Sequence, residues 1–220
     1  MSKTLSAVTF SEDQAEAYDA MTELMAKAGV DLVEGHTTPL NDAKSQVMAI
    51  VGKAGSGKTL LLAKMVEAVV DAGVDLISGD YDGKPRKDRR TIAVLAPTNK
   101  AASVLRNRGV PATTIHRILY TPMYDPEYER IADWLAGQGE KPQIEGLTEV
   151  SLERARLFYE ANKSIPGALA AAGLKGSDFI QGWKRREDPL DIGFIDESSM
   201  LDEKQYEDLR EIFPTLVLFG

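Results

Sequence analysis

The stretch GKAGSGKT, residues 52–59, combines residue types and a spacing that suit the binding of a polyphosphate. It fits the pattern G-x-x-x-x-G-K-[ST], in which glycines let the backbone turn its N–H groups inward around phosphate oxygens. The positive end of a helix that begins just after the loop adds to this field. Lys58 would reach the β- and γ-phosphates, and the Thr59 hydroxyl would bind magnesium. The sequence therefore predicts a site for ATP and Mg²⁺ formed by Gly52, Ala54, Gly55, Ser56, Gly57, Lys58 and Thr59.

A pair of acidic residues, Asp196 and Glu197, follows the apolar run of residues 192–195. Such a run is typical of a buried strand, so both side chains should emerge at the carboxyl end of that strand. Asp196 would hold magnesium through water, and Glu197 would orient and deprotonate an attacking water. We therefore take Lys58, Asp196 and Glu197 as candidate catalytic residues, and Thr59 and Asp196 as candidate metal ligands.

Two further polar loops are VLAPTNKAA, residues 94–102, and TIHRILY, residues 114–120. Their side chains can donate hydrogen bonds to the phosphates of a nucleic acid without reading its bases. Residue type alone leaves another interpretation open for each loop. Thr98 could simply cap the next helix, and His116 could be a hydrogen-bonded histidine of the core.

The elements that must position these residues alternate along the chain. Apolar runs and periodicity predict a helix over 12–28 capped by Ser11, strands over 47–51, 91–96, 192–195 and 216–219, and helices over 57–71, 99–106 and 203–213. Strands joined by helical crossovers form a parallel sheet covered by helices on both faces, with ligands beyond the carboxyl ends of the strands. We therefore expect an α/β fold.

The composition of the chain argues against several other classes of protein. The chain has 220 residues and is 43% hydrophobic, which suits one domain with an insertion. It has no cysteine and only two histidines, so a disulfide scaffold, a thiolate metal site or a histidine-rich metal site is not expected. A net charge of −8 argues against indiscriminate coating of nucleic acid. No segment approaches the roughly 20 apolar residues of a membrane span, so we expect a cytoplasmic protein without a membrane partner.

Positive charge is concentrated in KPRKDRR, residues 84–90, and KRR, residues 184–186. Charge runs of this kind are typical of solvated loops. We expect the first to flank the tip of a hairpin around Asp82 and Gly83, and the second to be a solvated loop.

The segments GKAGSGKT, APTNKAA, TIHRIL and DESSM, in that order, resemble motifs I, Ia, Ib and II of superfamily 1 helicases. The resemblance is to the RecD-like branch, which moves 5′ to 3′ on DNA and includes proteins similar to the exodeoxyribonuclease V alpha subunit. The segment FSEDQ, residues 10–14, is similar to the Q motif of this family. The resemblance covers residues 8–120 and 190–220. It implies a RecA-like P-loop NTPase fold and an ATP-dependent DNA helicase.

Residue roles follow from the resemblance position by position. It implies that Gln14 recognises adenine. It also implies single-stranded DNA as the partner, contacted by Pro97, Thr98, Asn99, Thr114 and His116. Asn99 stands where many members have glycine. The family context is DNA repair and recombination, and a nuclease or repair partner stays unidentified.

The resemblance also divides the chain. Residues 1–120 correspond to the first part of RecA-like domain 1A, residues 121–190 to an insertion resembling subdomain 1B, and residues 191–220 to the rest of domain 1A. Helices are expected in the insertion over 152–162 and, opened by Pro166, over 168–174. Its aromatic residues, Trp134, Tyr159 and Trp183, could stack on bases or form a small core.

The final stretch LVLFG, residues 216–220, resembles the strand that precedes motif III. We therefore expect the first motor domain of a longer protein, whose second RecA-like domain would supply an arginine finger. On that view the chain alone would bind Mg-ATP weakly and hydrolyse it at a barely measurable rate. Two alternatives stay open: a P-loop kinase or other small-molecule phosphotransferase, and a nucleotide-binding module without turnover.

Overall fold

The computed structural model describes residues 9–38, 45–77, 90–143 and 148–220. Contacts divide the chain into two compact units. Unit 1 comprises Met1–Leu119 and Arg186–Gly220, and unit 2 comprises Tyr120–Arg185. Within the described ranges, no helix is both long and apolar enough to cross a lipid bilayer.

Unit 1 is built around a parallel sheet with the strand order β3-β10-β9-β5-β4, and β6 lies beside β5. The strands are β3 (Gln46–Ile50), β4 (Asp75–Ile77), β5 (Thr91–Ala96), β6 (Thr113–Thr114), β9 (Ile192–Ile195) and β10 (Thr215–Phe219). Val217 of β10 pairs with Met48 on one side and Phe194 on the other. The strand before the phosphate loop and the strand before the acidic pair therefore flank β10, and their carboxyl ends meet at one edge.

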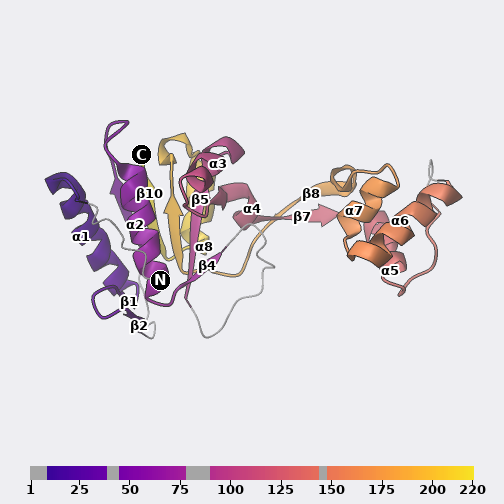
Figure 1. Ribbon diagram of the computed structural model, residues 1–220, viewed down its shortest axis with the longest axis horizontal. Helices are drawn as coiled ribbons and strands as arrows, with labels where there is room; N and C mark the ends of the chain where they lie inside the picture. The colour runs from indigo at the N-terminus through magenta and orange to yellow at the C-terminus, as the bar shows by residue number, and fades with distance from the viewer. Residues whose placement is uncertain (1–8, 39–44, 78–89, 144–147) are drawn as a thin grey trace, which may run out of the picture. The chain divides into compact units, whose positions relative to one another are not determined.

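The helices of unit 1 are α1 (Glu12–Lys27), α2 (Lys58–Asp71), α3 (Asn99–Asn107), α4 (Ile115–Leu119) and α8 (Glu203–Ile212) (Figure 1). Side chains of α1, α2 and α3 form one core with the inward residues of the sheet, among them Phe194 and Val217. Successive residues of a strand face opposite sides of the sheet, so Gly193, next to Phe194 in β9, faces the side away from this core. There an added Cβ would lie 2.9 Å from the ring of Phe213, which directly follows α8. The predicted α/β fold with helices on both faces is confirmed.

The start of α1 agrees with the cap predicted at Ser11. Ser11 forms a capping box with Gln14, its hydroxyl accepting from the Gln14 N–H at 3.3 Å. Asp202 forms a second capping box with Gln205 at the start of α8. Each box satisfies backbone N–H groups that the first turn of a helix leaves unpaired.

The basic run of residues 84–90 contains an exception to the expected solvated loop. Residues 84–89, and the predicted hairpin tip at 82–83, lie outside the described residues. Arg90 itself is buried, with its Nε donating to the Gly29 carbonyl at 3.0 Å and its Nη2 to the Thr38 carbonyl. Burial lowers the pKa of Arg90, and the charge of Asp191 opposes that shift. The solvated-loop prediction is wrong for Arg90, because this side chain ties the segment after α1 to the sheet.

Unit 2 has an antiparallel pair of strands, β7 (Tyr120–Tyr124) and β8 (Ile180–Arg185). Between them lie α5 (Pro126–Leu135), α6 (Glu149–Asn162), α7 (Ile165–Ala171) and the short 3₁₀ helix η1 (Gly176–Phe179). A small core contains Ile131, Ala155, Leu169 and Phe179. Trp134 and Tyr159 pack against this core, whereas Trp183 on β8 is 46% exposed.

The basic run KRR is not a solvated loop. Lys184 and Arg185 belong to β8, where Lys184 pairs with Thr121 and Arg185 with Tyr120. Arg186 is buried in unit 1, and its Nε donates to the Ile118 carbonyl at 2.9 Å. Arg186 is therefore a structural residue that satisfies a buried carbonyl.

Candidate active site

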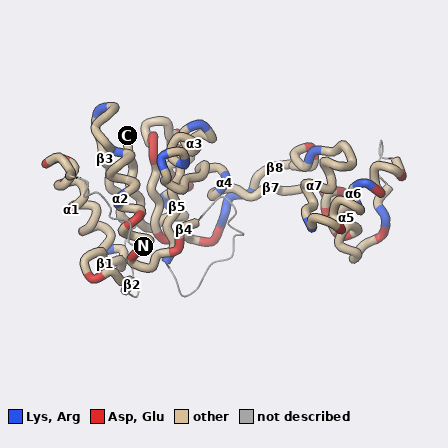
Figure 2. Tube along the Cα trace, in the orientation of Figure 1, with Lys and Arg blue, Asp and Glu red and all other residues tan. Residues whose placement is uncertain are grey.

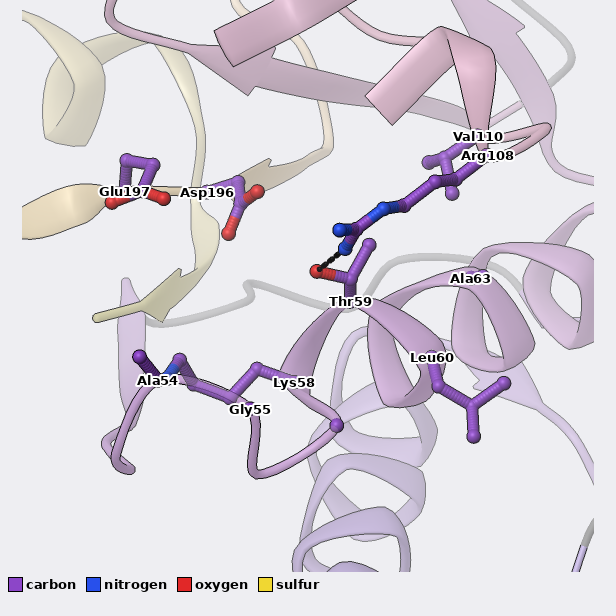
Figure 3. A pocket seen from close by; sticks show the side chains of 11 residues that line it. Ala54, Gly55, Lys58, Thr59, Leu60, Ala63, Arg108, Val110, Asp196 and Glu197 are labelled. Carbon is purple, nitrogen blue, oxygen red and sulfur yellow. Dashed lines mark hydrogen bonds between the residues drawn. The ribbon is translucent and has the colours of Figure 1, made fainter. Parts of the chain in front are cut away.

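A pocket of about 510 Å³ lies beside the phosphate loop. It is lined by seven of the predicted residues: Ala54, Gly55, Gly57, Lys58, Thr59, Asp196 and Glu197 (Figure 3). The first five come from the loop and the start of α2, and the last two follow β9. The structure thus brings together two segments that lie about 140 positions apart in the sequence.

The loop has the backbone that its glycines allow. Gly55 and Gly57 both have φ of +83°, in the left-handed region where a side chain would be strained. The Lys58 ammonium donates to the carbonyl of Gly52 and, at 3.1 Å, to that of Lys53. Neutral carbonyls therefore hold this cation within the loop, and anionic phosphate oxygens are stronger acceptors for the same protons.

A second pocket of about 510 Å³ is lined by Gln14 together with Gly52, Ser56 and Lys58. The Gln14 Nε2 donates to the Ser56 carbonyl at 2.8 Å, and its Oε1 accepts from the Ser11 N–H at 3.0 Å. A Cβ at Gly57 would lie 2.3 Å from that same Nε2. Gln14 thus braces the phosphate loop and caps α1, and recognition of adenine by Gln14 stays a prediction.

The acidic pair occupies a sharp bend after β9. The Asp196 N–H donates to the Leu95 carbonyl at 2.9 Å, which extends the sheet pairing by one residue. Glu197 has φ of +53° and precedes the 3₁₀ helix η2 (Ser198–Met200). A left-handed backbone costs a non-glycine residue roughly 1–2 kcal/mol, and such conformations cluster at functional sites. At this bend both carboxylates line the pocket.

The pKa of Asp196 is raised above its ordinary value, mainly because the carboxyl group is partly buried. The backbone N–H of Glu197 lowers this pKa, and the charge of the Glu197 side chain raises it. The charges of Lys58 and Arg108 also lower it. The desolvation of a half-buried carboxylate is therefore the dominant influence. A bound dication would favour the charged form of this carboxyl.

The raised pKa of Asp196 gives a pH prediction. Only the carboxylate binds magnesium, so as pH falls through this raised pKa, magnesium-dependent nucleotide affinity should fall. The loss should begin at a higher pH than for an ordinary aspartate. Calorimetric titration of a nucleotide with Mg²⁺ at a series of pH values measures it. Asp196→Asn is the control, because it retains the titration of the nucleotide phosphates. A pH profile identical in both proteins would contradict the assignment of Asp196 to the metal.

The donor set fits magnesium. The Thr59 hydroxyl and the Asp196 carboxylate line one pocket and both offer oxygen, the ligand atom that this ion prefers. In the described part of the chain, no group of three or more Asp, Glu, His or Cys side chains is arranged to hold a metal. Magnesium commonly binds through one or two protein oxygens, with water and substrate phosphates completing its shell.

A family model described as an AAA domain matches residues 38–218. The match spans the phosphate loop, the acidic pair and the strands of the parallel sheet. The chain belongs to the AAA domain family. No curated protein matches it. Family and phosphate loop together make it a P-loop domain of the nucleotide-binding type.

In the AAA domain the two polar loops leave neighbouring strands, β5 and β6. Pro97, Thr98 and Asn99 follow β5, and Thr114 in β6 pairs with Ala96 at the end of β5. Both loops therefore leave the same edge of the sheet as the phosphate loop. His116, in α4, is exposed.

The structure settles the two alternatives that residue type left open. The Thr98 hydroxyl accepts from the Ala101 N–H at 3.1 Å, so Thr98 does cap α3. The exposure of His116 excludes a core histidine. DNA contact by these loops stays a prediction.

Sequence reasoning missed four residues of the pocket lining, Leu60, Ala63, Arg108 and Val110, of which only Arg108 is charged. Arg108, which ends α3, lines the pocket, and its Nη1 donates to the Thr59 Oγ1 at 3.2 Å (Figure 3). The two residues are 49 positions apart, and no motif links them. They meet because α2 and α3 both pack on the same core of the sheet.

Proposed function

We propose that this AAA domain is the motor domain of an ATP-dependent DNA helicase of superfamily 1, in the RecD-like branch. It would couple hydrolysis of Mg-ATP to movement along single-stranded DNA. The observation that carries the proposal is the sharing of one sheet edge by the nucleotide pocket and the two polar loops. β5, which carries the first polar loop, pairs directly with β9, which carries Asp196 and Glu197.

Coupling between the two sites has a physical route. α3 is capped at its start by Thr98, in the first polar loop, and at its end by Arg108, which lines the nucleotide pocket. A short helix moves as a rigid element, so a change at one end would be felt at the other.

In hydrolysis, Lys58 would bind the β- and γ-phosphates, and Thr59 and Asp196 would hold magnesium directly or through water. Magnesium, when bound, supplies charge compensation on the phosphates. Glu197 would orient the attacking water and accept its proton. In this proposal a second RecA-like domain supplies the arginine finger, and unit 2 serves as subdomain 1B.

The test is binding of a fluorescent oligodeoxythymidine, followed by anisotropy. Basic and acidic segments are interspersed along both units (Figure 2), and the net charge is −8, so we expect weak binding that falls steeply with salt. Asn99→Asp places a carboxylate where DNA phosphates are expected and should weaken binding about tenfold. Gln138→Glu makes the same charge change in an exposed segment of unit 2 and is the control.

Two results would contradict the proposal. One is the absence of any DNA binding even at low salt. The other is equal weakening by Asn99→Asp and Gln138→Glu, which would indicate that only net charge matters. Nucleotide binding without DNA binding would instead favour a small-molecule phosphotransferase.

A further inference from the structure

Arg108 presents a cation to the nucleotide pocket from an unexpected element. It is the C-terminal cap residue of α3, and its side chain extends toward Thr59 at the start of α2 (Figure 3). The pocket therefore receives two cations from one chain, Lys58 from the phosphate loop and Arg108 from α3.

The contact that Arg108 makes is weak for a guanidinium. Its partner is a neutral hydroxyl at 3.2 Å, and the residue is exposed. Within the described ranges no carboxylate lies within 4 Å of its side-chain nitrogens. A guanidinium presents a planar fork of donors that matches phosphate oxygens, and such bonds are stronger than bonds to a neutral oxygen.

The hydrogen bond to Thr59 shows where in the pocket the Arg108 guanidinium lies. The Thr59 hydroxyl is the candidate magnesium ligand, and that ion would compensate the charge of the β- and γ-phosphates. A guanidinium within hydrogen-bonding distance of this hydroxyl lies close to the place where the terminal phosphate is expected. The exchange of a hydroxyl for a phosphate needs only a rotation of an exposed side chain.

We propose that Arg108 binds the terminal phosphate of a nucleoside triphosphate and so makes the site discriminate triphosphate from diphosphate. This inference rests on the proposed nucleotide site and adds a residue to it. Arg108 would act from the same chain, and from the helix that starts at the first polar loop.

Calorimetry on the whole chain tests the inference with Mg²⁺ and either ADP or a non-hydrolysable ATP analogue. Arg108→Ala should weaken binding of the triphosphate about tenfold, the loss of one charge-assisted hydrogen bond, and change ADP affinity by less than about twofold. Arg108→Lys should fall between, because an ammonium keeps the charge without the fork. Arg154→Ala removes an exposed arginine from α6 and should leave both affinities unchanged.

The outcomes separate this inference from the proposed function. An unchanged triphosphate-to-diphosphate ratio in Arg108→Ala would overturn the inference alone. Tighter triphosphate binding by that variant would also overturn it, because Arg108 would then compete with the metal. If the wild-type chain bound neither nucleotide, the proposed function would fail together with the inference.

Discussion

Replacing Lys58 with alanine should abolish measurable binding of Mg-ATP. The ammonium is held inside the phosphate loop by the carbonyls of Gly52 and Lys53 and is the cation that this loop would present to a nucleotide. Its removal leaves the charge of the β- and γ-phosphates poorly compensated. The loss of two charge-assisted hydrogen bonds corresponds to a weakening of about 100-fold or more. Calorimetry or a fluorescent ATP analogue measures this loss.

Lys64→Ala is the matched control for Lys58→Ala. Lys64 lies on the same helix, and its ammonium pairs with Glu67 at 2.7 Å. Surface ion pairs of this kind contribute little to stability, so this variant should bind nucleotide as the wild type does. Equal affinity of Lys58→Ala and the wild type would show that the loop does not bind phosphate.

Replacing Glu197 with glutamine should leave binding of Mg-ATP intact and stop its hydrolysis. The amide can still orient water but cannot accept a proton from it. General-base catalysis contributes roughly 10²–10⁴ in rate, so a loss of that size is expected. A single-turnover assay with protein in excess, followed for hours, measures even a slow reaction.

Glu207→Gln serves as the control for Glu197→Gln, since Glu207 is an exposed residue of α8 that does not line the pocket. It should hydrolyse ATP at the wild-type rate. Hydrolysis by Glu197→Gln within a few-fold of the wild type would exclude Glu197 as the base and direct attention to another carboxylate of the pocket.

Much of the fold could be predicted because the main strands are apolar runs of four to six residues between recognisable helices. β5 and β9 match their predicted ranges, and β10 begins one residue earlier than expected. The strands β7 and β8 of unit 2 were missed, and so were the two-residue strand β6 and the three-residue strand β4 of unit 1. Strands this short show no periodicity, and they form because a neighbouring strand offers hydrogen-bonding groups.

The candidate site was predictable where a local motif specified it. The phosphate loop and the acidic pair each follow a strand, and parallel strands deliver such segments to one edge. Arg108 was not predictable, because its contact with Thr59 depends on how α2 and α3 pack on the shared core of the sheet. Arg90 and Arg186 were misjudged for a related reason. Runs of charged residues are usually exposed to solvent. These two side chains instead donate hydrogen bonds to backbone carbonyls 52 to 68 positions away.

In the proposed motor domain, the nucleotide site and a track for single-stranded DNA share one edge of the sheet. Ultraviolet crosslinking of the chain to an oligodeoxythymidine, with Mg²⁺ and a non-hydrolysable ATP analogue present, tests it directly by mass spectrometry. We expect crosslinked peptides that contain residues 97–99 and 114–116, and a marked loss of these crosslinks in Asn99→Asp. A crosslinking pattern that includes neither loop would contradict the claim.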